Sequence, residues 1–200
     1  MQLVVATANK AKFREIIDIL SDLRISFLPI GLVRAYVPPT EVGLTYAENA
    51  AAKAQSAARF TGMWSLADDS GLEVEALGDQ PGPLSSRFLG QAATDRDRNE
   101  RLLELLRGIP VTRRTARFRC VVAVAGPGRE LFLAHGCCVG LISEALDGIG
   151  GFGYDPIFVV PEQGATMASL PPEVKNRISH RARALEKTKR FLNGIVTSQT

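Results

Sequence analysis

The first sixty residues alternate between strand-like and helix-like hydrophobic patterns. A short apolar run at 2–6 predicts a buried first strand, and a second run at 25–30 predicts another. Between them, apolar residues recur at the i, i+3, i+4, i+7 spacing of one helix face, which predicts a helix over 10–23. Strands that alternate with helices are typical of an α/β fold.

The stretch 45–62 carries the clearest helix signals in the chain. Thr45 and Glu48 have the spacing of a capping box, alanines fill the centre, and Gly62 is a typical helix end. Similar signals predict two more helices, one over 94–108 and one over 180–195 with Ser179 as its cap.

In the second half the hydrophobic period changes to that of a strand. Apolar residues at alternate positions from 116 to 124 predict one strand, and 129–140 can pair with it as a hairpin across the Gly-Pro-Gly segment 126–128. A glycine-rich loop then leads into another strand near 160. The order predicts an α/β fold with a mixed sheet, and the 200 residues suit a single domain, 1–200, with two small lobes that share a core.

Composition narrows the classes of function. Hydrophobic residues make up 46% and charged residues 22%, which suits a protein with a substantial core. The net charge of +3 is compatible with small anionic ligands but is well below the basic excess of a nucleic-acid binder. Three cysteines, two of them adjacent, do not suggest a disulfide framework, and no apolar run approaches the roughly 20 residues of a membrane span. We expect a cytoplasmic protein that binds neither membrane nor nucleic acid.

The segment 66–74, LADDSGLEV, places Asp68 and Asp69 between two apolar runs. Asp, Ser and Gly are typical turn residues, so one interpretation is a surface turn between two short strands. The other interpretation is a ligand site, because adjacent carboxylates repel each other unless a cation or proton intervenes and because α/β sheets bind ligands at strand ends. The residues alone leave both open.

The turn 7–12 joins the first strand to the first helix. Backbone N–H groups and the dipole at a helix start attract anions, and Lys12 in the first turn is unfavourable unless an anion lies nearby. An ordinary helix start capped by Asn9 explains the same residues equally well.

Two later segments have possible ligand-binding residues. Gly148, Gly150 and Gly153 match G-x-G-x-x-G, but a strand follows instead of a helix, so we exclude a dinucleotide site. The loop could still approach a ligand and offer aromatic faces to a base. His180 and Arg181 at a helix start would suit a carbonyl or a phosphate, although a histidine beside a cap is often structural.

Arginines 113, 114, 117 and 119 raise the possibility of a nucleic-acid surface. Strand alternation explains them more simply, because it points Ala116, Phe118 and Cys120 inward and Arg117 and Arg119 outward.

Five stretches occur in the order and spacing of one known family. They are TANKAK (7–12), EVGLTYAENAAAKA (41–54), ADDSGLEVEALGDQPGPLSSRFLG (67–90), GGFGYDPIF (150–158) and KNRISHRARAL (175–185). Together they resemble the Ham1/inosine triphosphatase family, which hydrolyses non-standard purine nucleoside triphosphates. The resemblance extends from residue 3 to about residue 192 and is strongest to bacterial members.

The resemblance implies an α/β fold with a long mixed sheet and flanking helices in two lobes around a central cleft, and it implies a homodimer. It also implies a Mg²⁺-dependent reaction in which dITP, ITP, XTP or dXTP and water give the monophosphate and pyrophosphate, which cleanses the nucleotide pool. The alternative enzyme class is a Maf-like pyrophosphatase that acts on modified pyrimidine nucleotides.

The resemblance also implies site residues. Glu41 and Asp69 would hold Mg²⁺, Asp69 would be the general base, and Asp68 would support it. The expected phosphate contacts are Thr7, Ala8, Asn9, Lys10, Ala11, Lys12, Lys53 and Ser70. The expected nucleoside contacts are Phe152, Gly153, Tyr154, Asp155 and Lys175, with His180 and Arg181 as donors to the 6-carbonyl of the purine. Adenine carries an amine at that position and would leave such donors unpaired.

Overall fold

The computed structural model describes residues 1–40, 43–128 and 130–198, and these residues form two compact units. The first unit comprises Met1–Asp69, Cys120–Gly136 and Arg181–Thr200, and the second comprises Ser70–Arg119 and Cys137–His180. The chain passes from one unit to the other within three strands and at the start of the last helix.

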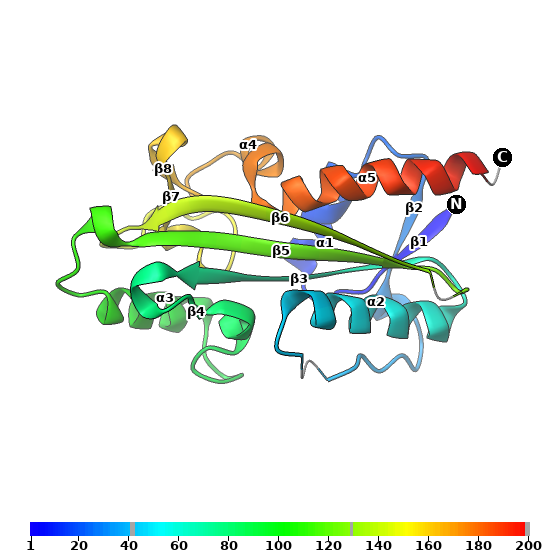
Figure 1. Cartoon of the computed structure of the whole chain (residues 1–200), viewed down its shortest axis with the longest axis horizontal. Coiled ribbons are helices and arrows are strands. Elements are labelled where there is room, and N and C mark those ends of the chain that lie inside the picture. The colour runs from blue at the N-terminus through cyan, green and yellow to red at the C-terminus, as the bar shows by residue number, and fades with distance from the viewer. Residues whose placement is uncertain (41–42, 129, 199–200) are drawn as a thin grey trace. The chain divides into compact units, whose positions relative to one another are not determined.

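The strands of the described residues form one mixed sheet in the order β2-β1-β3-β5-β6-β7-β8, with β4 paired to β3 (Figure 1). β1 is parallel to β2 and β3, whereas the pairs β3–β4, β6–β7 and β7–β8 are antiparallel. The strands are β1 (Gln2–Val5), β2 (Ser26–Pro29), β3 (Ser65–Val74), β4 (Gln80–Pro81), β5 (Thr115–Ala125), β6 (Leu131–Ile142), β7 (Phe158–Val160) and β8 (Ala165–Thr166). The predicted α/β class with a mixed sheet is therefore confirmed.

The helices follow their predicted caps more closely than their predicted ends. They are α1 (Lys10–Ile19), α2 (Tyr46–Thr61), α3 (Asp95–Leu105), α4 (Pro172–Ile178) and α5 (His180–Ser198). The capping box of Thr45 and Glu48 is present, and Gly62 ends α2 in the left-handed conformation. The helix α1 ends four residues before the predicted boundary, where the Ser21 hydroxyl donates to the carbonyl of Asp18 at 2.8 Å. The short α4 was not predicted.

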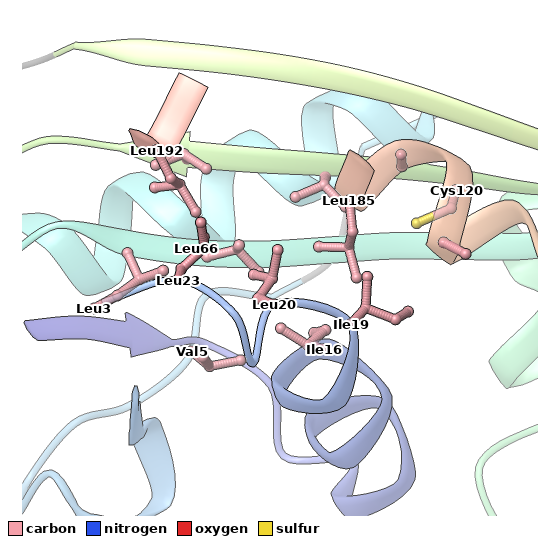
Figure 2. Packing of buried hydrophobic residues seen from close by; sticks show 14 residues of the cluster. Leu3, Val5, Ile16, Ile19, Leu20, Leu23, Leu66, Cys120, Leu185 and Leu192 are labelled. Atoms are coloured by element: carbon pink, nitrogen blue, oxygen red, sulfur yellow. The ribbon is translucent and has the colours of Figure 1, made fainter. Parts of the chain in front are cut away.

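The first unit has a hydrophobic core on each face of its strands. Leu3, Leu66 and Cys120 pack with α1 and α5 on one face (Figure 2), whereas Val4 and Ala67 pack with α2 on the other. Figure 1 shows the same arrangement, with α5 and α2 on opposite sides of β3. Because side chains alternate along a strand, each apolar run of β1 and β3 supplies both cores.

The second unit has a single core. Leu102 of α3 and Leu106, which caps its end, pack there with Leu72 of β3 and with the aromatic rings of Phe118 and Phe158. The centroids of those two rings lie 4.3 Å apart. This core fixes α3 and the segment around 154–167 in the same unit.

The prediction of two short strands around an acidic turn was wrong. β3 is a single strand over Ser65–Val74, and Asp68 and Asp69 lie in its middle. Strand alternation places Asp68 on the side of Leu66, toward α1 and α5, and Asp69 on the side of Ala67, toward α2. The strand tolerates these acids because Asp68 meets Lys12 of α1 and Arg181 of α5, whereas Asp69 meets Lys53 of α2.

Within 1–40, 43–128 and 130–198, none of the helices combines the length and apolar character that a membrane span needs.

Candidate active site

Asp68 is the centre of a buried charge cluster on one face of β3. Its Oδ2 atom lies 3.1 Å from Nζ of Lys12 and accepts two hydrogen bonds from Arg181, at 3.2 Å from Nε and 3.0 Å from a terminal nitrogen. The other terminal nitrogen of Arg181 donates to Glu15 at 2.5 Å. Arg181 is 1% exposed. The two carboxylates therefore take the place of water as hydrogen-bond acceptors for its guanidinium.

These neighbours determine the protonation state of Asp68. Burial alone would raise its pKa, but the charges of Lys12, Arg181 and Lys53 outweigh burial and lower the pKa of Asp68 well below its usual range. The nearby Cys120 shows the opposite effect, because burial and then the negative charge of Asp68 raise the pKa of its thiol to about 12. Asp68 is therefore a carboxylate and Cys120 a thiol at neutral pH.

Asp69 occupies a separate environment on the opposite face of β3. Its Oδ2 atom accepts a hydrogen bond from Nδ2 of Asn49 at 3.2 Å, and its Oδ1 atom lies 3.2 Å from Nζ of Lys53. Asn49 and Lys53 are four residues apart on α2, so they share one face of that helix. This face of α2 therefore provides one donor to each oxygen of the Asp69 carboxylate.

The two adjacent carboxylates are therefore not bridged by one shared cation, the arrangement that the ligand-site interpretation of LADDSGLEV allowed. They point to opposite faces of the strand, and their ion pairs differ: Asp68 pairs with Lys12 and Arg181, and Asp69 pairs with Lys53. The cluster also explains Lys12, because the anion that compensates this lysine in the first turn of α1 is the Asp68 carboxylate.

Asn9 caps α1 as predicted. Its Oδ1 atom accepts hydrogen bonds from the backbone N–H groups of Ala11 at 2.9 Å and Lys12 at 3.0 Å. The Thr7 hydroxyl accepts one from the backbone N–H of Asn9 at 3.2 Å. Binding of a triphosphate by 7–12 stays a prediction, as does a phosphate contact from Ser70, which lies on β3 in the second unit.

The predicted metal ligand Glu41 lies outside the described residues. Among those residues, no group of three or more His, Cys, Asp or Glu side chains could hold a metal ion. Magnesium binding by Asp69 stays a prediction; Mg²⁺ commonly takes only one or two protein carboxylates and completes its shell with waters and substrate phosphates.

In the second unit, three of the predicted nucleoside contacts lie together, because Asp155 contacts both Phe152 and Lys175. Its Oδ2 atom accepts a hydrogen bond from the backbone N–H of Phe152 at 2.8 Å and forms an ion pair with Nζ of Lys175. The same Nζ lies 4.9 Å from the centroid of the Phe152 ring. Gly151 has a φ of +70°, and a Cβ there would be 2.1 Å from the Asp155 carboxylate. The glycine thus lets the loop fold tightly over Asp155.

His180 and Arg181 are neighbours in sequence but have different surroundings. The His180 ring is 5% exposed and stacks on Phe118, with centroids 4.7 Å apart and planes inclined by 19°. Arg181 instead belongs to the charge cluster of Asp68 and Glu15 in the first unit. Recognition of a purine by this pair stays a prediction.

Tyr154 is buried in the core of the second unit at 5% exposure. Its hydroxyl donates to the carbonyl of Ser85 at 2.9 Å, and burial raises the pKa of that hydroxyl. This bond joins the glycine loop to the segment Gly82–Arg87.

Two side chains of the first unit that contact the acidic pair or its partners were not predicted from the sequence. Asn49 is 2% exposed, binds Asp69, and also accepts from the N–H of Gly43 at 3.0 Å and donates to its carbonyl at 3.3 Å. Its position four residues before Lys53 on an alanine-rich helix was the available signal. Glu15, three residues after Lys12 on α1, shares a helix face with that lysine and could have been found in the same way.

The arginine-rich strand has the alternation expected of a sheet. Ala116, Phe118 and Cys120 are buried. Arg119 donates to Glu73 at 2.6 Å and Arg117 to Asp79 at 2.9 Å. Arg117 and Arg119 are more exposed than the buried positions that alternate with them, as the simpler interpretation of this segment predicts, and both are paired with acids within the second unit.

A model of the Ham1 family matches residues 3–191. This chain belongs to the Ham1 family. Two curated relatives carry the name dITP/XTP pyrophosphatase. The protein from Desulforamulus reducens is 48% identical over 100% of this chain and 99% of its own length, and the one from Geobacter sulfurreducens is 47% identical over 96% of each.

Solved structures of Ham1 proteins agree with this assignment. The Ham1 protein from Coxiella burnetii superimposes with a TM-score of 0.88 at 41% identity, covering 97% of this chain and 99% of that one. The curated Ham1 relatives are named for purine nucleotides, so the comparisons do not favour a Maf-like enzyme for pyrimidine nucleotides.

Proposed function

We propose that this member of the Ham1 family hydrolyses the non-standard purine nucleotides dITP, ITP, XTP and dXTP to the monophosphate and pyrophosphate. The observation that carries the proposal is 47–48% identity, over at least 96% of each chain, with two proteins named dITP/XTP pyrophosphatase. The arrangement around Asp69 provides chemistry suited to this reaction.

Asp69 is the proposed general base. Asn49 and Lys53 fix both oxygens of its carboxylate, so an attacking water can be held in one orientation. In the proposed step the water oxygen bonds to the α-phosphorus, its proton passes to Asp69, and the bond from the α-phosphorus to the bridging oxygen breaks. Pyrophosphate leaves in line with the attack.

Asp69 and Glu41 are the proposed magnesium ligands. When bound, the ion would neutralise charge that develops on the phosphate oxygens. Lys53, Ser70 and the segment 7–12 are the proposed phosphate contacts, and the lysines among them add positive potential.

The proposed purine contacts are those that the family resemblance implies. Phe152, Gly153, Tyr154, Asp155 and Lys175 would frame the nucleoside. His180 and Arg181 would donate to the 6-carbonyl, which hypoxanthine and xanthine present and adenine lacks. A homodimer and a cytoplasmic location complete the proposal and rest on the family resemblance.

A substrate panel tests the proposal. Turnover of dITP, XTP, GTP, ATP and a modified pyrimidine triphosphate is measured with Mg²⁺ and with EDTA, and pyrophosphate and orthophosphate are scored separately. We expect pyrophosphate from dITP and XTP only when Mg²⁺ is present, with ATP slower by as much as ~10⁴-fold. Preference for the pyrimidine nucleotide, or release of orthophosphate alone, would refute the proposal.

A further inference from the structure

One face of α3 holds the glycine loop at Gly153. The N–H of Gly153 donates to Oδ2 of Asp95 at 2.8 Å, and its carbonyl accepts from Nδ2 of Asn99 at 2.9 Å. Asp95 and Asn99 are four residues apart, so both lie on the same face of the helix. Both polar backbone groups of one loop residue are therefore fixed by one rigid element.

The two side chains are themselves held in place. Asn99 is 1% exposed, so little water competes for its bond to Gly153. The other oxygen of Asp95 accepts from Arg98 at 3.1 Å, and Arg98 also donates to the carbonyls of Phe88 at 3.1 Å and Gly90 at 3.3 Å. Asp95 thus has a fixed orientation toward the loop even though its side chain is 54% exposed.

This loop needs external support. Gly153 has a φ of +62°, and with Gly150 and Gly151 nearby the free segment would have large conformational entropy. The start of the loop is tied by the N–H of Gly150, which donates to the carbonyl of Ala168 at 2.9 Å. Beyond Gly153 the loop is tied by the ion pair of Asp155 with Lys175. The bonds from α3 fix Gly153 itself, whereas its neighbours Phe152 and Tyr154 bond to Asp155 and Ser85.

We infer that Asp95 and Asn99 are positioning residues that hold the Gly153 peptide, and thereby keep the loop 150–154 in the conformation that receives the purine. The purine part of this inference rests on the proposed function. The hydrogen bonds of these two side chains go to Gly153 and Arg98, not to any of the proposed phosphate contacts. A preformed loop lowers the ordering cost of binding the base, so loss of these bonds should weaken purine binding more than it slows chemistry.

Two variants and a control on the same helix test this inference. Asp95→Ala removes the acceptor for the Gly153 N–H, and Asn99→Leu removes the donor to its carbonyl at similar volume. Glu100→Gln is the control, because Glu100 is exposed and its ion pair is with Arg96 of the same helix. Hydrogen exchange of the Gly153 amide is measured by NMR, together with KM and kcat for dITP and the inhibition constant of pyrophosphate, which carries no purine.

In both variants we expect exchange at Gly153 and KM for dITP to rise ~10-fold, the effect of one hydrogen bond, while kcat changes less than about 3-fold. The inhibition constant of pyrophosphate and all values for Glu100→Gln should stay as in the wild type. Unchanged exchange and KM in Asp95→Ala would overturn the inference. An equal rise in KM and in the pyrophosphate inhibition constant would also overturn it, because it would show a general loss of structure.

If Asn99→Leu does not fold, the exchange rate of the Gly153 amide and the KM for dITP in Asp95→Ala decide whether the inference holds. If the wild type releases no pyrophosphate from dITP, the proposed function and the purine part of the inference both fail. Exchange at Gly153 would still show whether Asp95 and Asn99 hold the loop, so the two failures are distinguishable.

Discussion

Replacement of Asp69 by asparagine is expected to lower kcat for dITP by about 10³-fold or more while the protein remains folded. General-base catalysis by a positioned side chain typically contributes ~10²–10⁴-fold, and an amide cannot accept the proton of the attacking water. The change is nearly isosteric, so the Lys53 ammonium can still donate a hydrogen bond to the amide oxygen at this position. Pyrophosphate release under saturating dITP and Mg²⁺ measures the effect.

Asp22→Asn is a suitable control for this experiment. It makes the same chemical change at a carboxylate that is 66% exposed and pairs with Lys189. It should keep the kcat of the wild type, and circular dichroism should show the same fold for both variants. Wild-type turnover by Asp69→Asn would remove Asp69 from the mechanism.

Replacement of Arg181 by methionine is expected to cause the largest loss of stability. The guanidinium is 1% exposed and compensates two carboxylates, Asp68 and Glu15. Methionine fills a similar volume but leaves Asp68 buried with less positive charge around it. Removal of one partner from a buried ion pair typically costs ~3–5 kcal/mol, and the free energy of unfolding in urea at neutral pH should fall by about that amount.

Two other variants show whether the cost comes from buried charge. Arg190→Met changes an exposed arginine of the same helix and should alter the free energy of unfolding by less than ~0.5 kcal/mol. Glu15→Gln keeps the pair of Arg181 with Asp68 and should give an intermediate loss. Equal stability of Arg181→Met and wild type would mean that the cluster contributes nothing to the folded state.

The pH dependence of this cluster has a definite sign. Because the pKa of Asp68 is lowered in the folded state, its contribution to stability is present above the ordinary carboxylate pKa near 3.8 and is lost as the pH falls below that value. The cluster therefore stabilises the protein throughout the neutral range.

Local patterns were sufficient to predict most elements of this fold. The capping box at Thr45 and the cap at Asn9 predicted the starts of α2 and α1, because caps depend on residues close in sequence. The alternation from 116 to 124 predicted β5 for the same reason. Helix α4, which begins at Pro172, was not predicted. It has only seven residues, and such a short segment does not show helical periodicity.

The prediction of a turn at Asp68 and Asp69 was wrong because the conformation of this segment depends on residues that are distant in the sequence. Asp, Ser and Gly favour a turn locally, but Lys12, Lys53 and Arg181 supply the charges that let Asp68 and Asp69 lie within a strand. Those partners come from three helices, so no local pattern could reveal them. The family resemblance located the same carboxylates but could not show that they point to opposite faces.

The position of bond cleavage tests the central claim most directly. Hydrolysis of dITP is carried out in H₂¹⁸O with the wild-type protein and Mg²⁺, and the products are analysed by mass spectrometry. If water attacks the α-phosphorus, all of the label will appear in dIMP and none in pyrophosphate. Label in pyrophosphate, or formation of labelled orthophosphate as the first product, would contradict attack at that atom.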